Sequence, residues 1–177
     1  MKIYTKTGDQ GMTQIYADKT TRVRKDSVEL ALYGTLDQLN ALVGLLCCEL
    51  TGDEQISKLT PALQQIQQNL FQLGYGISAQ KVLDDSQTEQ LEQAIDHFYA
   101  ELPPQTSFIL PSGTKAACTA HLCRTTTRQA ERMMVGIQDH YDIPTNHLRF
   151  LNRLSDYFFA LARWLNASRD VQEVPVP

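Results

Sequence analysis

The stretch 148–165, LRFLNRLSDYFFALARWL, contains a regular apolar pattern that decides the fold class. Its large apolar residues recur at steps of three or four positions: Leu148, Leu151, Leu154, Phe158, Leu161 and Leu165. This spacing places one stripe of side chains on one face of an α-helix. The stretch therefore predicts a long amphipathic helix that packs against neighbouring helices in a bundle.

Other parts of the chain repeat this pattern. Long apolar stripes span 32–50, 56–77 and 116–137, and a shorter stripe spans 91–102. Short polar segments such as 51–53 and 142–145 join them, which favours antiparallel neighbours. The sequence therefore predicts an all-α, five-helix up-and-down bundle. We expect a single domain over 1–177, with the bundle over 27–170 and an irregular segment over 1–26.

Composition narrows the class of protein. The 177 residues are 42% hydrophobic and 20% charged, which is typical of a globular domain. The net charge of −4 gives no basic surplus for general nucleic-acid binding. The longest apolar run, 41–48, is far shorter than the roughly 20 residues that cross a bilayer. The N-terminus has no apolar signal-peptide core. We therefore expect a cytoplasmic protein with no nucleic-acid or membrane partner.

The four cysteines do not form a metal-binding or redox motif. Cys47 and Cys48 are adjacent, and Cys118 and Cys123 lie in a helical pattern without Cys-x-x-Cys spacing. We expect small buried thiols in a reducing compartment rather than disulfides or structural zinc.

A charged ridge lies on the predicted helix over 116–137. At about 100° per residue, its side chains project within an arc of about 100°. The ridge consists of Arg124, Arg128, Glu131 and Arg132. A solvated helix face is one interpretation. However, three arginines on one ridge repel each other, and a bound polyphosphate would relieve that repulsion through bidentate guanidinium contacts.

The N-terminal segment has residues that suit the same ligand. In TKTGDQGMT, 5–13, glycines would let backbone N–H groups approach phosphate, and threonine hydroxyls or Asp9 could help to position Mg²⁺. Lys25 could add a positive charge. The segment lacks the G-x-x-x-x-G-K-[ST] pattern of a P-loop, so an ordinary glycine-containing turn is the alternative.

Two polar positions lie beside apolar stripes. Asp37 and Asn152 would each occur next to core residues, where polar side chains often bond a helix end or a neighbouring helix. An aspartate at such a position needs a cationic partner, because an unpaired buried carboxylate is costly. Ser112 or Thr114 could cap the helix that follows Pro111.

Other catalytic classes have little support. A di-iron bundle needs Glu-x-x-His on two helices, and none of the histidines has a glutamate three positions earlier: His97, His121, His140 and His147. The G-x-S-x-G and H-E-x-x-H motifs are also absent.

Taken together, these residues resemble the PduO-type ATP:cob(I)alamin adenosyltransferases. Four blocks in the family's order carry the resemblance: IYTKTGDQGMT at 3–13, RKD and YGTLDQLNALVG within 24–44, FILPSGTKAA and HLCRTTTRQAER within 108–132, and LNRLSDYFFALAR at 151–163. Any one block is moderately specific, whereas the ordered set is strongly so. Residues 51–104 are poorly diagnostic.

The resemblance implies transfer of the 5′-deoxyadenosyl group of ATP to the cobalt of cob(I)alamin or another corrinoid, with Mg²⁺ and release of triphosphate. It implies a homotrimer with active sites between subunits and transient contact with a corrinoid reductase. The N-terminal segment would fold over the nucleotide. The implied ATP-binding residues are Thr5, Lys6, Thr7, Gly8, Thr13, Lys25, Arg128, Glu131, Arg132 and Asn152.

The resemblance also implies three catalytic roles in addition to that of Arg128. Asp37 and Arg124 match a pair that joins subunits near the active site. Phe108 matches the aromatic residue that packs against the corrin and helps to expel the lower axial ligand of cobalt. No protein metal ligand is implied, so Mg²⁺ is expected to arrive with ATP.

Two positions depart from the family pattern. Ser112 stands where glycine is usual, and Gln129 stands where an arginine commonly follows Arg128. We expect altered affinity rather than lost chemistry. A nucleotide- or corrinoid-binding chaperone or sensor that lost turnover, and a purely structural helical oligomerisation module, are the competing interpretations.

Overall fold

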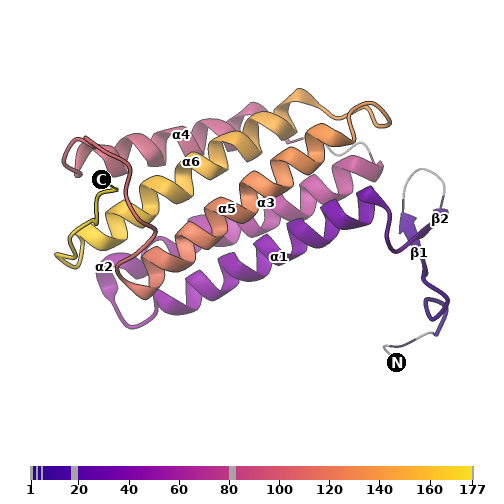
Figure 1. Cartoon of the computed structure of the whole chain (residues 1–177), viewed down its shortest axis with the longest axis horizontal. Coiled ribbons are helices and arrows are strands. Elements are labelled where there is room, and N and C mark those ends of the chain that lie inside the picture. The colour runs from indigo at the N-terminus through magenta and orange to yellow at the C-terminus, as the bar shows by residue number, and fades with distance from the viewer. Residues whose placement is uncertain (1, 3, 5, 17–19, 80–82, 177) are drawn as a thin grey trace.

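The computed structural model describes residues 2, 4, 6–16, 20–79 and 83–176 (Figure 1). Five long helices run side by side in alternating directions. They are α1 (Val28–Glu49), α3 (Thr60–Ala79), α4 (Asp85–Ala100), α5 (Lys115–Gly136) and α6 (Thr145–Ala167). A single turn, α2 (Glu54–Ser57), precedes α3. The predicted all-α, five-helix bundle is confirmed.

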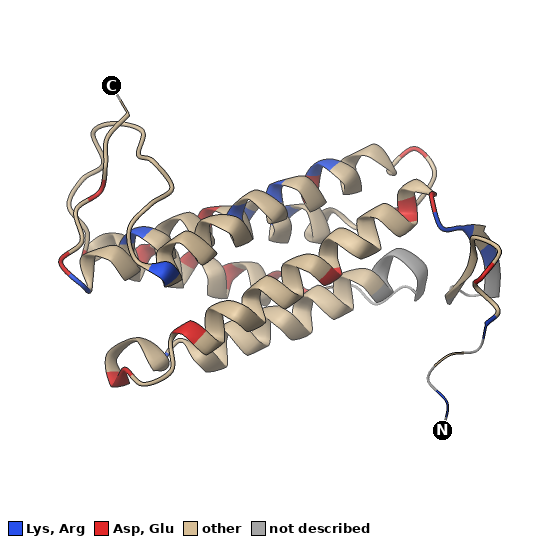
Figure 2. Ribbon diagram, turned by 60° about the horizontal axis from the view of Figure 1, so that its bottom comes forward, with Lys and Arg blue, Asp and Glu red and all other residues tan. Residues whose placement is uncertain are grey.

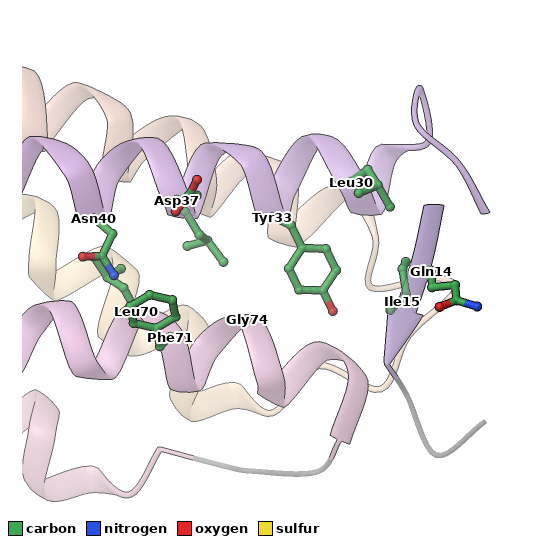
Figure 3. A pocket seen from close by; sticks show the side chains of 10 residues that line it. Gln14, Ile15, Leu30, Tyr33, Asp37, Asn40, Leu70, Phe71 and Gly74 are labelled. Carbon is green, nitrogen blue, oxygen red and sulfur yellow. The ribbon is translucent and has the colours of Figure 1, made fainter. Parts of the chain in front are cut away.

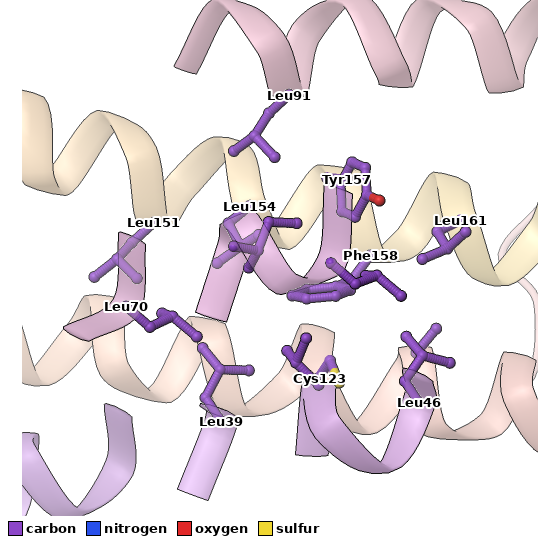
Figure 4. Close-up of a cluster of buried hydrophobic side chains, with 14 of the residues drawn as sticks. Leu39, Leu46, Leu70, Leu91, Cys123, Leu151, Leu154, Tyr157, Phe158 and Leu161 are labelled. Atoms are coloured by element: carbon purple, nitrogen blue, oxygen red, sulfur yellow. The ribbon is translucent and has the colours of Figure 1, made fainter. Parts of the chain in front are cut away.

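Helix α6 lies between α4 and α5 and joins two halves of the bundle. It packs against both of them, while α1 packs against α5 and α3. Figure 4 shows Leu154, Phe158 and Leu161 of α6 among apolar side chains of the other helices. Every residue from Ala160 to Asn166 is buried. Apolar burial on all sides of this part of α6 therefore fixes the positions of α4 and α5 relative to each other.

Local signals explain where the helices begin. The side chains of Ser27, Asp53, Asp84 and Thr114 each accept a hydrogen bond from a backbone N–H group in the first turn that follows. Thr114 is thus the predicted cap of α5. The predicted stripe over 56–77 is divided between α2 and α3. Pro61 lies in the first turn of α3, where a proline is tolerated.

The first 26 residues are less irregular than predicted. Strands β1 (Met12–Tyr16) and β2 (Thr20–Arg24) pair antiparallel, with Thr13 opposite Val23 and Ile15 opposite Thr21. Threonine, valine and isoleucine are branched at Cβ and favour extended backbone. The prediction of an irregular segment over 1–26 is therefore wrong for β1 and β2.

The cysteines are all free, as expected, but their burial differs from the prediction. Cys123 is buried, and burial raises the pKa of its thiol to about 12. Cys47 and Cys118 are half-buried, and Cys48 is exposed. Cys47 and Cys48 lie on α1 and point in different directions, and Cys118 and Cys123 lie on α5.

Among the described helices, α1 alone has the length and hydropathy of a membrane span, and its stripe packs in the bundle core.

The connection from α4 to α5 is tied to the end of α6 through one amide side chain. Asn166 donates a hydrogen bond from Nδ2 to the Ser112 carbonyl at 2.9 Å and accepts one from the Thr114 N–H at 2.9 Å. Between them, Gly113 has a φ of +108°, and a Cβ there would lie 2.5 Å from Asn166 Cγ. Position 113 therefore requires glycine for both conformation and space.

We expect Gly113→Ala to lower the free energy of unfolding by about 1–3 kcal/mol, because strain and a clash with Asn166 both oppose the native turn. Thermal unfolding followed by circular dichroism measures the loss. Ser112→Ala is the matched control, since Ser112 is not among the residues with positive φ. Equal stability of the two variants would contradict this account of the turn.

Candidate active site

The basic residues of the bundle are confined to one part of it. Within the described helices, every Lys and Arg lies on α5 or α6 (Figure 2). Arg128 and Arg132 are exposed on α5, and Arg124 is half-buried. No ion pair joins any of these three arginines to a carboxylate among the described residues. The ridge therefore has positive charge available for an external anion.

Arg124 is the most constrained arginine of the ridge. Its guanidinium carbon lies 5.9 Å from the centroid of the Phe159 ring, and its Nε is buried without a hydrogen-bond partner. Burial and the nearby charge of Arg128 lower the pKa of Arg124. Because arginine stays protonated in proteins, a buried unpaired donor here favours an incoming acceptor.

A hollow of about 700 Å³ lies between α4, α5, α6 and the segment before α5. We call it the α4–α5–α6 hollow. Phe108, which is 83% exposed, lies at this hollow with Arg124 and Arg128, so the structure brings three predicted site residues together. Its apolar lining comes from Ile95, Tyr99, Phe108 and Phe159.

Some of the opposite charges at this hollow are paired with each other, whereas Asp96, which also lines it, forms no ion pair among the described residues. Arg153 donates from Nε to Glu92 Oε1 at 2.9 Å and from Nη1 to Asp156 Oδ2 at 2.8 Å. The hydrogen bond with Glu92 is the main reason that the pKa of Arg153 is raised. Since Arg153 has both of these partners, Arg124 and Arg128 are the cations of the hollow lining without an ion pair among the described residues.

Glu131 and Asn152 meet across the α5–α6 interface. Asn152 Nδ2 donates a hydrogen bond to Glu131 Oε1 at 3.0 Å, and both side chains lie near the surface. The structure thus places these two predicted nucleotide contacts next to each other. Arg132 follows Glu131 on the same helix, so the ridge extends from the hollow along α5.

The N-terminal segment contains a second group of predicted residues. A Cβ added to Gly8 would lie 3.1 Å from Lys25 Nζ, so the lysine side chain crosses the turn where glycine leaves space. Arg22 Nη2 donates to the Thr7 carbonyl at 3.0 Å, and Lys6 has a left-handed φ of 61°. These contacts give a closed turn with ammonium and hydroxyl groups, whose donors suit phosphate.

One further predicted residue of this group has a different position. Thr13 lies within β1 rather than in the turn. Thr5 lies outside the described residues.

The predicted residues do not all meet within one chain. Figure 1 shows the β1–β2 hairpin at one end of the bundle and the connection that contains Phe108 toward the other. Asp37 lines a separate cleft of about 310 Å³ with Ile15, Tyr33 and Phe71 (Figure 3). No described contact joins Asp37 to Arg124. One chain thus presents two separate groups of predicted site residues on different surfaces.

Sequence reasoning missed Tyr99 and Phe159, which line the hollow. A signal for Phe159 existed. It follows Asn152 by seven residues and therefore lies on the same helix face, so it is a large aromatic residue on a polar face. Tyr99 had no comparable signal, since residues 51–104 carry no diagnostic motif.

A comparison with known families matches residues 3–165 to a family model described as cobalamin adenosyltransferase. The chain belongs to the cobalamin adenosyltransferase family. Among its relatives, a corrinoid adenosyltransferase of Bacillus subtilis (strain 168) is 43% identical over 98% of this chain and 91% of the relative. A cobalamin adenosyltransferase of Cupriavidus metallidurans is 40% identical over 93% of this chain and 88% of the relative.

Solved structures agree with this assignment. A variant PduO-type ATP:corrinoid adenosyltransferase from Lactobacillus reuteri, complexed with cobalamin and ATP, superposes with a TM-score of 0.90. It is 35% identical, and the match covers 99% of each chain. The cobalamin adenosyltransferase fold is thus shown over essentially the whole length.

The two departures from the family pattern have mild structural consequences. Ser112 has no positive φ, so a serine fits there without backbone strain, and the required glycine is Gly113. Gln129 is exposed on α5, beside Arg128 rather than at the hollow. Neither position disturbs the arrangement of Phe108, Arg124 and Arg128.

His121 lies one turn before Arg124 and is 4% exposed. Its ring centroid lies 6.1 Å from that of Phe159, and both ring nitrogens are buried without hydrogen-bond partners. Burial and the charge of Arg124 lower its pKa to about 4, although Glu173 acts in the opposite direction. The imidazole beside the hollow is therefore neutral at neutral pH.

This histidine should make the fold sensitive to acid. Its folded-state pKa of about 4 lies below the ordinary value of 6.5, so protons bind the unfolded chain more strongly. The contribution of the neutral imidazole to the free energy of unfolding is complete above pH 6.5 and is lost as the pH falls toward 4. Between pH 7 and pH 5, we expect the wild type to lose about 2 kcal/mol more stability than His121→Gln.

Urea unfolding at a series of pH values measures this difference. His140→Gln is the matched control, because it makes the same replacement at an exposed histidine. Identical pH profiles for the wild type and His121→Gln would contradict the burial of a neutral imidazole.

Proposed function

We propose that this cobalamin adenosyltransferase transfers the 5′-deoxyadenosyl group of ATP to the cobalt of a Co(I) corrinoid, giving adenosylcobalamin and triphosphate. The observation that carries the proposal is the α4–α5–α6 hollow, where Arg124 and Arg128 lie beside Phe108, Tyr99 and Phe159 and form no ion pair within the described chain. Cations suit the polyphosphate, and aromatic faces suit a flat macrocycle. Relatives named for this activity and structures with both ligands support it.

The chemistry requires little from protein acids or bases. Co(I) donates an electron pair to the 5′ carbon, a cobalt–carbon bond forms, and the bond from that carbon to the triphosphate oxygen breaks. Triphosphate leaves with the electrons of the broken bond. Arg128, Arg132 and Lys6 would stabilise its growing charge, and the protein would hold cobalt and carbon in line.

Phe108 has a different task. An apolar aromatic wall at the hollow favours a cobalt without its polar lower ligand, because the ligand would lose its hydrogen bonds to water there. Loss of that ligand makes reduction to Co(I) easier. A corrinoid reductase would supply the electron, as the family resemblance implies.

Mg²⁺ fits this site only as a companion of ATP. The described residues contain no cluster of three His, Cys, Asp or Glu side chains that could hold a metal. Asp9 in the turn and Glu131 on the ridge offer single carboxylates, and Mg²⁺ commonly uses one or two carboxylates together with substrate phosphates. When bound, it would neutralise phosphate charge.

We further propose a homotrimer in which the two groups of predicted site residues, one from each of two neighbouring subunits, combine into one active site. Asp37 is exposed on α1, and Arg124 lacks an anionic partner within the described chain, so the two are complementary across an interface. Exposed apolar residues on these helices, Leu45, Leu122 and Val135, give the interface apolar area.

We also propose that the enzyme acts in the cytoplasm, without nucleic-acid or membrane partners.

The direct assay mixes the protein with Mg-ATP and cob(I)alamin under strong reductant and follows adenosylcobalamin and triphosphate. We expect the wild type to form both products in equal amounts. Arg128→Lys should lower turnover by about tenfold or more, because lysine cannot make the bidentate contact of a guanidinium. Circular dichroism should show an intact fold.

Arg149→Lys is the control, since Arg149 pairs with Asp85 on the surface, away from the ridge. Ligand binding without product would contradict transferase activity and favour a chaperone or sensor. Failure to bind either ligand would leave a structural module. Unchanged kinetics of Arg128→Lys would remove this residue from the phosphate role.

The trimer makes a separate prediction. Asp37→Ala should make the assembly dissociate at about tenfold higher protein concentration, because one charge pair per interface is lost. Sedimentation velocity over a concentration series measures this change. Glu89→Ala is the control, because Glu89 is an exposed carboxylate on α4. A fully active Asp37→Ala trimer of wild-type stability would count against the pairing with Arg124.

A further inference from the structure

The segment that follows α6 is hydrogen-bonded to the backbone around Phe108. Leu110 N donates to the Val174 carbonyl at 2.8 Å, and Val176 N donates to the Phe108 carbonyl at 2.8 Å. Ile109 lies opposite Pro175 in an antiparallel bridge. The Phe108 side chain itself is 83% exposed, so its own packing contributes little to its position. Residues 173–176, the tail segment, therefore hold the backbone that presents Phe108.

An ion pair between a buried arginine and a half-buried glutamate anchors the tail segment. Arg163 of α6 is 1% exposed and donates from Nε to Glu173 Oε1 at 2.7 Å and from Nη2 to Glu173 Oε2 at 3.1 Å. The same Nη2 donates to the Pro103 carbonyl at 3.1 Å. One guanidinium thus joins the tail segment to the beginning of the connection that contains Phe108.

This anchor also adjoins the hollow. The Arg163 guanidinium carbon lies 5.6 Å from the ring centroid of Tyr99, which lines the α4–α5–α6 hollow with Phe108. Arg163 lies outside the hollow's lining and therefore does not contact a ligand there. An ion pair with two hydrogen bonds fixes orientation well, because both partners lose their bonds if either one moves.

We propose that Glu173, held by Arg163, is a positioning residue for the corrinoid step. Through the tail segment it sets the placement of Phe108 at the hollow, and so promotes loss of the lower cobalt ligand. The inference rests on the proposed function, in which this hollow receives the corrinoid. Neither Glu173 nor Arg163 lines the hollow, so both would act on the reaction only through Phe108.

The main variant is Glu173→Gln, which keeps the shape of the side chain and removes its charge. Amide hydrogen exchange should become faster at Leu110 and Val176, the two donors between the segments. Cob(II)alamin bound with Mg-ATP should retain more of its lower ligand, as read from its absorption and electron paramagnetic resonance spectra. We expect kcat/KM for the corrinoid to fall about tenfold, with KM for ATP within about twofold.

Val176→Pro is the second variant, because it removes the N–H that bonds the Phe108 carbonyl and leaves both residues of the ion pair unchanged. It keeps the test valid if the unpaired Arg163 prevents Glu173→Gln from folding. Asp85→Asn is the matched control, since it weakens the exposed pair with Arg149, far from the tail segment in sequence. It should change none of these readouts.

A double-mutant cycle with Phe108→Ala separates positioning from general stabilisation. If Glu173 acts through Phe108, Glu173→Gln and Val176→Pro should have little further effect on the corrinoid step in the Phe108→Ala background. Fully additive losses, or a loss confined to thermal stability, would overturn the inference while leaving the proposed function intact. A wild type that transfers no adenosyl group would overturn both.

Discussion

The burial of α6 between α4 and α5 is the constraint on which the candidate site depends. Its residues from Ala160 to Asn166 are all buried, so neither neighbour can shift without exposing apolar surface. This packing brings Arg124 of α5 and Tyr99 of α4 to one hollow. The positions of Arg124 and Tyr99 are therefore a consequence of how three helices pack, whereas Phe108 is presented by the connection before α5.

A second constraint is the separation of charge. Described helical cations occur only on α5 and α6, whereas α1 carries carboxylates such as Asp37 and Glu49. Arg153 and Arg163 form ion pairs within the chain, while Arg124, Arg128 and Arg132 have no carboxylate partner among the described residues. A chain with these unpaired cations needs anionic ligands from outside, which the phosphates of ATP and a neighbouring subunit would both supply.

The sequence predicted features that depend on local periodicity. The stripe of α6 and the ridge of α5 follow from helical spacing, and Thr114 caps α5 as its residue type suggests. The hairpin was missed because a weak period of two, in a threonine-rich segment, resembles an irregular loop. The pairing of 108–110 with 174–176 could not be predicted, since it joins segments more than 60 residues apart through backbone groups. Similarly, the position of Asp37 away from Arg124 depends on which faces of α1 and α5 meet, since these two helices pack against each other and Asp37 lies at a separate cleft.

The central claim is that ATP and corrinoid occupy connected regions, the turn and ridge for ATP and the hollow for corrinoid. Hydrogen exchange of the wild-type protein with Mg-ATP alone, cob(II)alamin alone and both ligands tests it most directly. The account predicts that ATP slows exchange at 6–11 and 22–25, and that the corrinoid slows exchange at 105–110 and 173–176. Protection confined to the opposite face, around Cys48 and Lys115, or identical protection by both ligands, would contradict it.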